Sequence, residues 1–151
     1  MLKGKILSPF FPRQWKVFTG NEIGVLLGWW LLSVYLKSDT AQQLPRDQLH
    51  FVASTVSSKM LGSVARAEGM HFHETLTGFK WMCSRVKELE AGGQGKVLLA
   101  FEEAIGFMCG SRVLDKDGVS AAVRAAELTA FLDRDCGGIT LNDKLEELYH
   151  Q

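Results

Sequence analysis

Short apolar runs alternate with amphipathic segments along this chain, and each kind of run predicts a different element. Short stretches that are apolar throughout or alternate with polar residues predict strands. Longer stretches with apolar residues at three- and four-residue steps predict helices. Strands are expected at residues 14–19, 49–54, 70–75 and 96–101, and helices at residues 19–36, 57–68, 78–91, 118–133 and from 140 onward.

Capping residues suggest where these helices begin and end. Side-chain oxygens of Ser, Thr, Asp and Asn accept hydrogen bonds from the first N–H groups of a helix. The expected N-terminal caps are Thr19 or Asn21, Ser57, Thr77, Asp117 and Thr140. Gly69 is expected to end the second helix, because glycine adopts the left-handed conformation that often closes a helix.

Strands that alternate with helices predict an α/β fold. We expect a three-layer α/β/α sandwich around a mostly parallel (mixed) sheet of about four strands. Ligands of such sheets bind beyond the carboxyl ends of the strands. Three loops are therefore expected to lie together at one edge, namely residues 55–58, 75–80 and 102–118.

The segment at residues 23–36 contains no charged residue. A helix that spans a membrane needs about 20 apolar residues, so this shorter run predicts a core helix covered on most sides by protein. Trp29 and Trp30 enlarge its apolar surface. No membrane partner is expected.

The charge balance argues against a nucleic-acid partner. The chain has 17 Lys plus Arg and 17 Asp plus Glu, whereas nucleic-acid-binding surfaces carry a basic excess. Its three cysteines, Cys83, Cys109 and Cys136, form no Cys-x-x-Cys pair. This pattern is typical of proteins in a reducing compartment and argues against a disulfide scaffold or a structural zinc site. We therefore expect a cytoplasmic protein.

Two adjacent glutamates, Glu102 and Glu103, follow the apolar run at residues 97–101. An isolated buried carboxylate is costly, so the pair is expected to be solvated, partnered or available to a ligand. Neighbours on an extended chain point in opposite directions, which disfavours a shared acid–base or metal site. One carboxylate can instead accept hydrogen bonds from two neighbouring sugar hydroxyls. The alternative is that one glutamate is solvated while the other caps a helix or pairs with a lysine.

Two other stretches suggest metal binding only weakly. His71 and His73 share a strand face beside Glu74, but zinc needs three or four ligands and no third follows at a suitable spacing. The Asp-Lys-Asp-Gly stretch at residues 115–118 lacks the remaining ligands of a calcium loop. It predicts a turn with a helix cap, which leaves Lys116 able to reach an anionic group. We expect no metal bound by this chain.

Five stretches together resemble the third domain of the α-D-phosphohexomutase superfamily. In chain order they read VFTGNEIGVLLGWWLL, STVSSKML, EGMHFHETLTGFKWM, AFEEAIGFMCG and VLDKDGVSAAVRAAEL. The resemblance runs from about residue 14 to residue 149 and is closest to the phosphoglucomutase-2 branch, which acts as a phosphopentomutase and phosphoglucomutase. We therefore expect an unmatched segment at residues 1–13 and an α/β/α sugar-binding domain at residues 14–151.

The resemblance implies a place in an enzyme of four domains around one cleft. The other domains carry a phosphoserine loop, a magnesium loop and a phosphate-binding loop, and the third carries the sugar-binding loop. The phosphoserine gives its phosphoryl group to the sugar phosphate, which makes a bisphosphate intermediate. This intermediate reverses its orientation in the cleft, and its other phosphate returns to the serine. The implied substrates are ribose or deoxyribose 1-phosphate or glucose 1-phosphate, and the implied cofactor is Mg²⁺, bound outside this domain.

The resemblance also implies which residues contact the sugar phosphate. The family's sugar loop reads Gly-Glu-x-Ser-Gly or Gly-Glu-Glu-Ser, whereas residues 101–104 read Phe-Glu-Glu-Ala. Ala104 thus stands where the family has serine, and Phe101 where it has glycine. The substrate-binding residues implied by the match are Glu102, Thr77, Gly78 and Lys116, with Glu103 as a weaker candidate.

Other parts of the family's machinery have no counterpart in this sequence. It contains neither a Thr-Ala-Ser-His-Asn-like phosphoserine stretch nor an Asp-x-Asp-x-Asp-Arg magnesium loop. Phosphoryl transfer depends on positioning and charge neutralisation, so we expect no catalytic residue here and no mutase turnover by this chain alone. The chain is expected to be a fragment of a four-domain enzyme, with the remaining domains as its partners.

Three alternatives remain open. The chain is a non-catalytic short form that binds sugar phosphates or partner proteins, or it is the matching domain of a glucose 1,6-bisphosphate synthase. The third alternative, an unrelated doubly wound nucleotide binder, is disfavoured because no glycine-rich loop joins a strand to a helix. Neither a preference for pentose or hexose nor an oligomeric state follows from the sequence.

Overall fold

A four-stranded sheet forms the centre of the computed structural model, which describes residues 15–38, 44–93 and 95–150. The strand order is β2-β1-β3-β4. Strands β1 (Leu49–Ser54), β2 (His71–Thr75) and β3 (Lys96–Glu102) are parallel, and β4 (Gly106–Met108) is antiparallel to β3. The expected α/β fold with a mixed sheet is confirmed.

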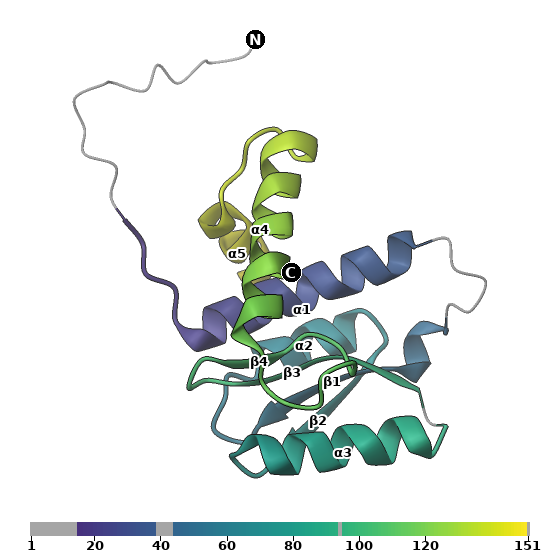
Figure 1. Ribbon diagram of the computed structural model, residues 1–151. Coiled ribbons are helices and arrows are strands. Elements are labelled where there is room, and N and C mark those ends of the chain that lie inside the picture. Colours follow the sequence, from purple (N-terminus) through teal and green to yellow (C-terminus); the bar gives the residue numbers. More distant parts are fainter. Residues whose placement is uncertain (1–14, 39–43, 94, 151) are drawn as a thin grey trace, which may run out of the picture.

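Helices cover both faces of this sheet (Figure 1). Helix α3 (Phe79–Ala91) lies on one face, and α1 (Gly20–Lys37) and α2 (Met60–Ala67) lie on the other. Helices α4 (Gly118–Asp135) and α5 (Leu141–Tyr149) pack on the outer side of α1. A short 3₁₀ helix, η1 (Arg46–Gln48), precedes β1. The three-layer expectation is therefore confirmed, with further helices stacked over one layer.

The central strands are buried on both faces, as their apolar sequences predict. Every residue of β1 is buried, and β3 is buried from Val97 to its end. The last residues of β3 alternate between two separate cores: Phe101 belongs to the core beneath α1, and Ala100 to the core beneath α3. This alternation places Glu102 on the α3 face of the sheet.

Helix α1 is enclosed between the sheet and the outer helices. Thr19 caps it with a reciprocal capping box to Glu22. Its glycines let it approach the sheet closely, because a Cβ on Gly24 would lie 2.6 Å from the Phe101 ring. This burial explains why most of the helix carries no charge. Among the described residues no helix is both long and apolar enough to cross a membrane.

Four local expectations are wrong. Residues 15–19 do not form a strand, and the Trp15 side chain is 97% exposed; residue 14 lies outside the described residues. The second helix begins at Met60 with Lys59 as its cap, because the Ser57 hydroxyl is used elsewhere. Thr77 does not cap the third helix.

The residue at that cap position is Gly78, with a φ of 111° and no side-chain hydrogen bond. The fourth difference is β4, three residues within the expected loop 102–118. By contrast, Thr140 caps α5 and Gly69 ends α2 with a φ of 70°, as expected.

The connections after β1 and β3 leave the sheet in different directions. β1 continues into α2 on one face, whereas β3 turns back through residues 103–105 into β4. The carboxyl ends of β1 and β3 are adjacent, since Ala53 pairs with Phe101. Such a point in an open α/β sheet is where ligands commonly bind.

Candidate functional site

Glu102 ends β3 with its side chain on the α3 face. It is only 6% exposed. The absence of a side chain on Gly106 makes room for it, because a Cβ there would lie 2.8 Å from Glu102 Oε1 and 2.7 Å from the Phe79 ring. A carboxylate held this deeply requires a polar or charged partner.

Lys116 is that partner. Its Nζ lies 3.5 Å from Glu102 Oε1 and 5.6 Å from the centre of the Phe79 ring. The Glu102 side chain is 8% exposed and that of Lys116 is 58% exposed. The ammonium group therefore covers the carboxylate on its solvent side. The exposed lysine is free to turn away only if another group, such as a ligand hydroxyl, replaces it, because an unpaired buried carboxylate is costly.

The loop around Lys116 is fixed on both sides of this residue. The backbone N–H of Lys116 donates to Asp115 Oδ1 at 2.8 Å. The N–H of Asp117 donates to the Phe107 carbonyl at 2.9 Å, which ties the loop to β4. Asp117 also caps α4, and hydrogen bonds from the Ser120 side chain and the Val119 N–H hold its pKa below the usual range.

Thr77 and Gly78 lie in the loop that leads into α3. Thr77 is exposed and Gly78 is half-buried. Gly78 immediately precedes Phe79, whose ring lies beside Glu102 and Lys116. The structure thus brings Glu102, Lys116 and the start of α3 together at one edge of the sheet.

Glu103 does not join this group. Its Oε2 accepts hydrogen bonds from Ser54 Oγ at 3.0 Å and from Ser57 Oγ at 3.2 Å. Both serines are buried. The two adjacent carboxylates therefore point to different sides of the sheet edge, as expected for neighbours on an extended chain.

Ser54 and Ser57 were missed as partners of a glutamate. The sequence shows two hydroxyls near the end of a buried strand, but they lie 49 and 46 residues from Glu103. Only the pairing of β1 with β3 brings them together. Once that pairing is known, a buried hydroxyl beyond β1 is the signal that would identify them.

Most of the chain matches a known family. Residues 19–151 match the family model described as "Phosphoglucomutase/phosphomannomutase, alpha/beta/alpha domain III". The chain belongs to this family. All of the proposed contact residues lie inside the matched range.

Curated relatives are similar over most of this domain III chain. A phosphopentomutase from Mus musculus is 53% identical over 137 residues, and a glucose 1,6-bisphosphate synthase from the same organism is 49% identical over 136; each alignment covers 90% of this chain. A phosphoribomutase from Saccharomyces cerevisiae is 43% identical over 73% of it. The chain spans about a fifth of the length of these relatives.

A solved structure supports the domain III fold independently. The crystal structure of a Thermus thermophilus protein provisionally named a phosphomannomutase superposes with a TM-score of 0.62. The alignment covers 87% of this chain and 25% of that protein, at 18% identity. At this identity the likeness shows the fold alone.

Three histidines gather on the α3 face of domain III, near the amino ends of β1 and β2. His50 Nδ1 lies 3.0 Å from His73 Nε2, and the rings of His50 and His71 are stacked. Arg85 Nη2 lies 3.2 Å from His73 Nδ1. Burial, with added repulsion from Arg85, His50 and His71, lowers the pKa of His73 to about 4. In the described part of the chain, no group of three or more His, Cys, Asp or Glu side chains could hold a metal ion.

The cysteines of domain III are free thiols with no sign of activation. Burial raises the pKa of Cys109 to about 11 against the opposing effect of Arg124. Burial also raises the pKa of Cys83. A reactive cysteine needs a lowered pKa, so neither thiol is suited to act as a nucleophile.

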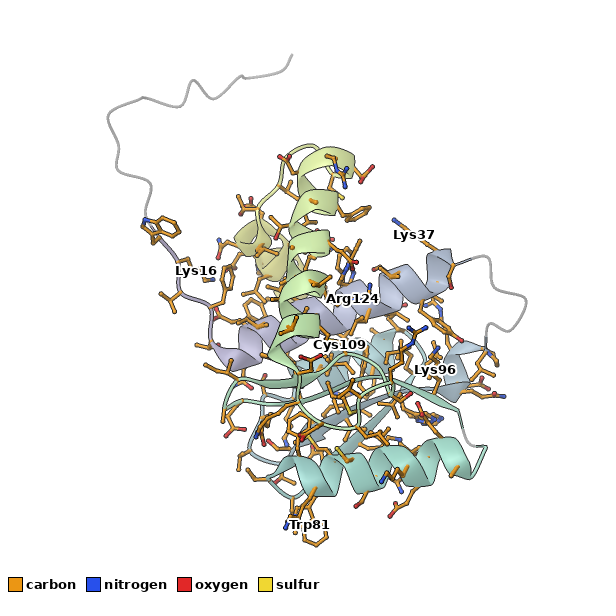
Figure 2. All side chains as sticks on the ribbon, viewed as in Figure 1. Lys16, Lys37, Trp81, Lys96, Cys109 and Arg124 are labelled. Carbon is orange, nitrogen blue, oxygen red and sulfur yellow. The ribbon has the colours of Figure 1, made fainter. Side chains whose placement is uncertain are left out.

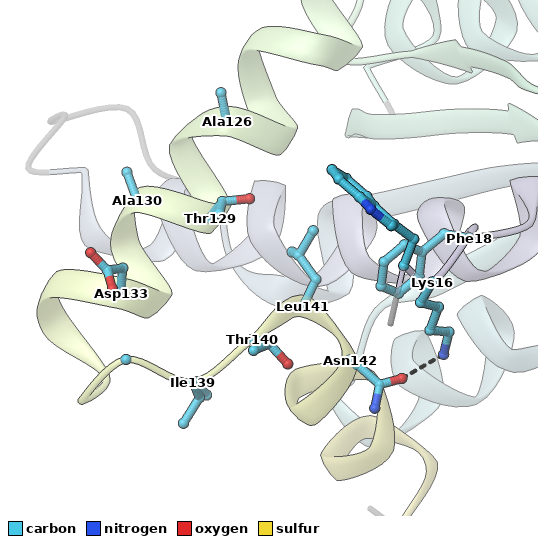
Figure 3. Close-up of a pocket in the computed structure, with 12 residues that line it drawn as sticks. Lys16, Phe18, Ala126, Thr129, Ala130, Asp133, Ile139, Thr140, Leu141 and Asn142 are labelled. Atoms are coloured by element: carbon cyan, nitrogen blue, oxygen red, sulfur yellow. Dashed lines mark hydrogen bonds between the residues drawn. The ribbon is translucent and has the colours of Figure 1, made fainter. Parts of the chain in front are cut away.

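Two hollows of domain III lie away from Glu102. One, of about 1000 Å³, lies between α4, α5 and the chain before α1, with Trp15 and Phe18 on its wall (Figure 3). A second hollow of about 390 Å³ includes Lys96, Cys109 and Arg124 in its lining (Figure 2). Neither contains a residue proposed from the sequence.

Proposed function

We propose that this chain, through residues 14–151, holds the sugar of a sugar phosphate within a phosphopentomutase- or phosphoglucomutase-type enzyme. The reaction is intramolecular phosphoryl transfer on ribose or deoxyribose 1-phosphate or glucose 1-phosphate through a bisphosphate intermediate. One observation carries the proposal: Glu102, a nearly buried carboxylate at the ligand-binding edge, is covered by an exposed ammonium group.

Each group at this edge has a role in the proposal. Glu102 accepts hydrogen bonds from neighbouring sugar hydroxyls, which replace Lys116 as partners of the buried carboxylate. Lys116 then turns toward the phosphate, where a cation is stabilised by the anionic group. Thr77 and Gly78 line the neighbouring loop on the phosphate side.

The rest of the reaction lies with other parts of the proposed enzyme. The described residues do not fit Mg²⁺, because Glu102 pairs with Lys116 and Glu103 with two serines. Any magnesium is therefore held by the remaining domains, which are the proposed partners. A cytoplasmic location accords with free thiols at all three cysteines.

The proposal is tested by amide NMR of the chain titrated with ribose 1-phosphate, glucose 1-phosphate and inorganic phosphate. We expect the sugar phosphates to shift the amides of Glu102, Gly106 and Lys116. Glu102→Gln should weaken this binding by about tenfold, the equivalent of one hydrogen bond to a charged group. Glu127→Gln, which removes an exposed carboxylate paired with Arg124, is the matched control.

Shifts confined to other regions, or no shifts at all, would contradict the proposal. A second candidate is the corresponding domain of a glucose 1,6-bisphosphate synthase. It is favoured by one finding, the 49% identity to such an enzyme, close to the 53% identity to the phosphopentomutase. Stronger binding of glucose 1-phosphate than of ribose 1-phosphate would favour this candidate.

A further inference from the structure

Three side-chain oxygen atoms form a closed triangle beside the proposed sugar site: one from the last residue of β1, one from the loop after β1 and one from the turn after β3. Ser54 Oγ lies 2.7 Å from Ser57 Oγ, and both lie within 3.2 Å of Glu103 Oε2. Ser54 is 0% exposed and Ser57 is 4% exposed. Neither serine can therefore reach a ligand directly, so whatever this triangle does for binding must act through Glu103.

Ser57 is the centre of this hydrogen-bond network. Its Oγ donates to the Glu103 carboxylate and accepts the backbone N–H of the same residue at 3.1 Å. The two hydrogen bonds fix both the side chain and the backbone of Glu103 against the loop after β1. Hydrogen bonds to a charged acceptor are stronger than neutral ones, and burial strengthens them further.

The same point is held from a third side by the start of α1. A Cβ on Gly20 would lie 2.1 Å from the Glu103 carbonyl oxygen, so the helix backbone is in contact with the turn. Asn21 Oδ1 accepts the N–H of Ser58 at 2.8 Å. Three segments far apart in the sequence therefore meet at Glu103.

The turn that begins at Glu103 is strained. Ile105 has a φ of 61°, which β-branched residues rarely adopt, and its side chain is 72% exposed. Strain of this kind persists only where the surrounding contacts outweigh it. The hydrogen bonds of Glu103 are the contacts at the start of the turn that can do so, and Glu102 is the residue immediately before it.

We propose that Glu103 is a positioning residue, held by Ser54 and Ser57, that fixes the turn after β3 so that Glu102 projects toward Lys116 and the sugar. This proposal rests on the proposed function of Glu102 and refines it, because it removes Glu103 from the residues that contact the sugar. The carboxylate of Glu103 is used within the protein, and its effect on ligand binding passes through its neighbour.

The test compares Glu103→Ala, Glu103→Gln and Ser57→Ala in the full chain. Two readouts are measured: the dissociation constant for ribose 1-phosphate, and the NOE contacts between the Glu102 side chain and the Phe79 ring. Both groups flank Gly106 in the structure. Glu127→Ala and Ser63→Ala are matched controls, because their partners Arg124 and Arg66 lie on exposed helix surfaces.

We expect Glu103→Ala to weaken binding about tenfold and to remove the Glu102–Phe79 contacts. Ser57→Ala should also weaken binding and remove these contacts, although the buried serine cannot touch the ligand itself. Glu103→Gln should keep part of the affinity and part of the contacts, because its amide oxygen still accepts hydrogen bonds from the serines. The controls should change neither readout. If Glu103→Ala fails to fold, Ser57→Ala carries the test.

Three outcomes separate this proposal from the one on which it rests. Retention of the Glu102–Phe79 contacts in both Glu103→Ala and Ser57→Ala overturns the positioning role. Weaker binding in Glu103→Ala with wild-type binding in Ser57→Ala also overturns it, since Glu103 would then contact the sugar itself. If the wild-type chain binds no ribose 1-phosphate, the proposed function fails, and loss or retention of the NOE contacts alone decides whether Glu103 positions its neighbour.

Discussion

Gly20 and Glu103 are in backbone contact: a Cβ added to Gly20 would lie 2.1 Å from the carbonyl oxygen of Glu103. This contact joins the first residue of α1 to the turn after β3. Gly20→Ala is therefore expected to lower the free energy of unfolding by about 1–3 kcal/mol, because the helix or the turn must shift. Urea denaturation measures the change.

The matched control for that substitution is Gly118→Ala. Gly118 is likewise the first residue of a helix, but nothing lies within 4 Å of its missing Cβ. Alanine has the higher helix propensity, so this change should leave stability unchanged or raise it by up to about 1 kcal/mol. Equal losses in the two variants would show that the close contact at Gly20 is not the cause.

The pair of Lys116 with Glu102 predicts different effects on stability and on binding. Lys116→Gln leaves the buried Glu102 carboxylate without its cationic partner, so the free energy of unfolding should fall by about 1–3 kcal/mol. Affinity for ribose 1-phosphate should fall about tenfold and become less sensitive to salt, because the cation that faces the phosphate is lost. Calorimetric titration at two salt concentrations measures both effects. Lys87→Gln on the exposed surface of α3 serves as the control, and an equal loss there would contradict the role of Lys116.

Two threonines that the sequence marks as caps are expected to behave differently. Thr140 Oγ1 accepts the Asp143 N–H at 3.2 Å, so Thr140→Ala should cost about 1 kcal/mol of stability. Thr77 makes no cap bond to α3, so Thr77→Ala should cost no cap energy. Thermal unfolding of the two variants measures both stability losses. Equal losses would contradict the capping role of Thr140.

The histidine cluster predicts a loss of stability in mild acid. The pKa of His73 in the folded chain is about 4, below its ordinary value of 6.5, because of burial and the charges of Arg85, His50 and His71. The unfolded chain therefore binds this proton first, and the stabilisation present above pH 6.5 is lost as the pH falls toward 4. Denaturant unfolding at a series of pH values across this window measures it.

His73→Phe should flatten this part of the pH profile, because phenylalanine takes up no proton. His150→Phe, an exposed substitution at the end of α5, should leave the profile as in the wild type. An unchanged pH dependence in His73→Phe would show that another group is responsible.

Local signals predicted the elements whose bonds are local. The two partners of each capping box, in α1 and in α5, lie three residues apart in the sequence. Thr140 was the expected cap of α5, and Thr19 was one of two candidates for α1, with Asn21 as the other. Ser57 has the same chemistry, but its hydroxyl bonds to Glu103, 46 residues away, and the helix begins only at Met60. Tertiary contacts thus override a local preference. Strand β4, with three residues, is too short for its pattern to be distinguished from a loop.

The candidate site was likewise predicted only where its features are local in the sequence. Because Glu102 follows a buried strand, it was predicted to lie at the carboxyl edge of the sheet, where ligands of such sheets commonly bind. That prediction needed no knowledge of its partners. The alternation of side chains separated it from Glu103. Pairing of one glutamate with a lysine was among the alternatives, but periodicity alone does not select Lys116 for Glu102, because none connects the loop before α4 to β3. His71 and His73 were expected on one strand face, but His50 was missed, since it joins them only through the pairing of β1 with β2.

The enclosure of α1 determines how the domain comes apart. One side of this helix packs on β3 and the other on α4 and α5, so neither group can leave without exposing it to water. Partial opening should therefore be rare, and unfolding should be cooperative across all layers. In hydrogen exchange, the central amides of α1 should exchange as slowly as those of β3, at the rate of global unfolding.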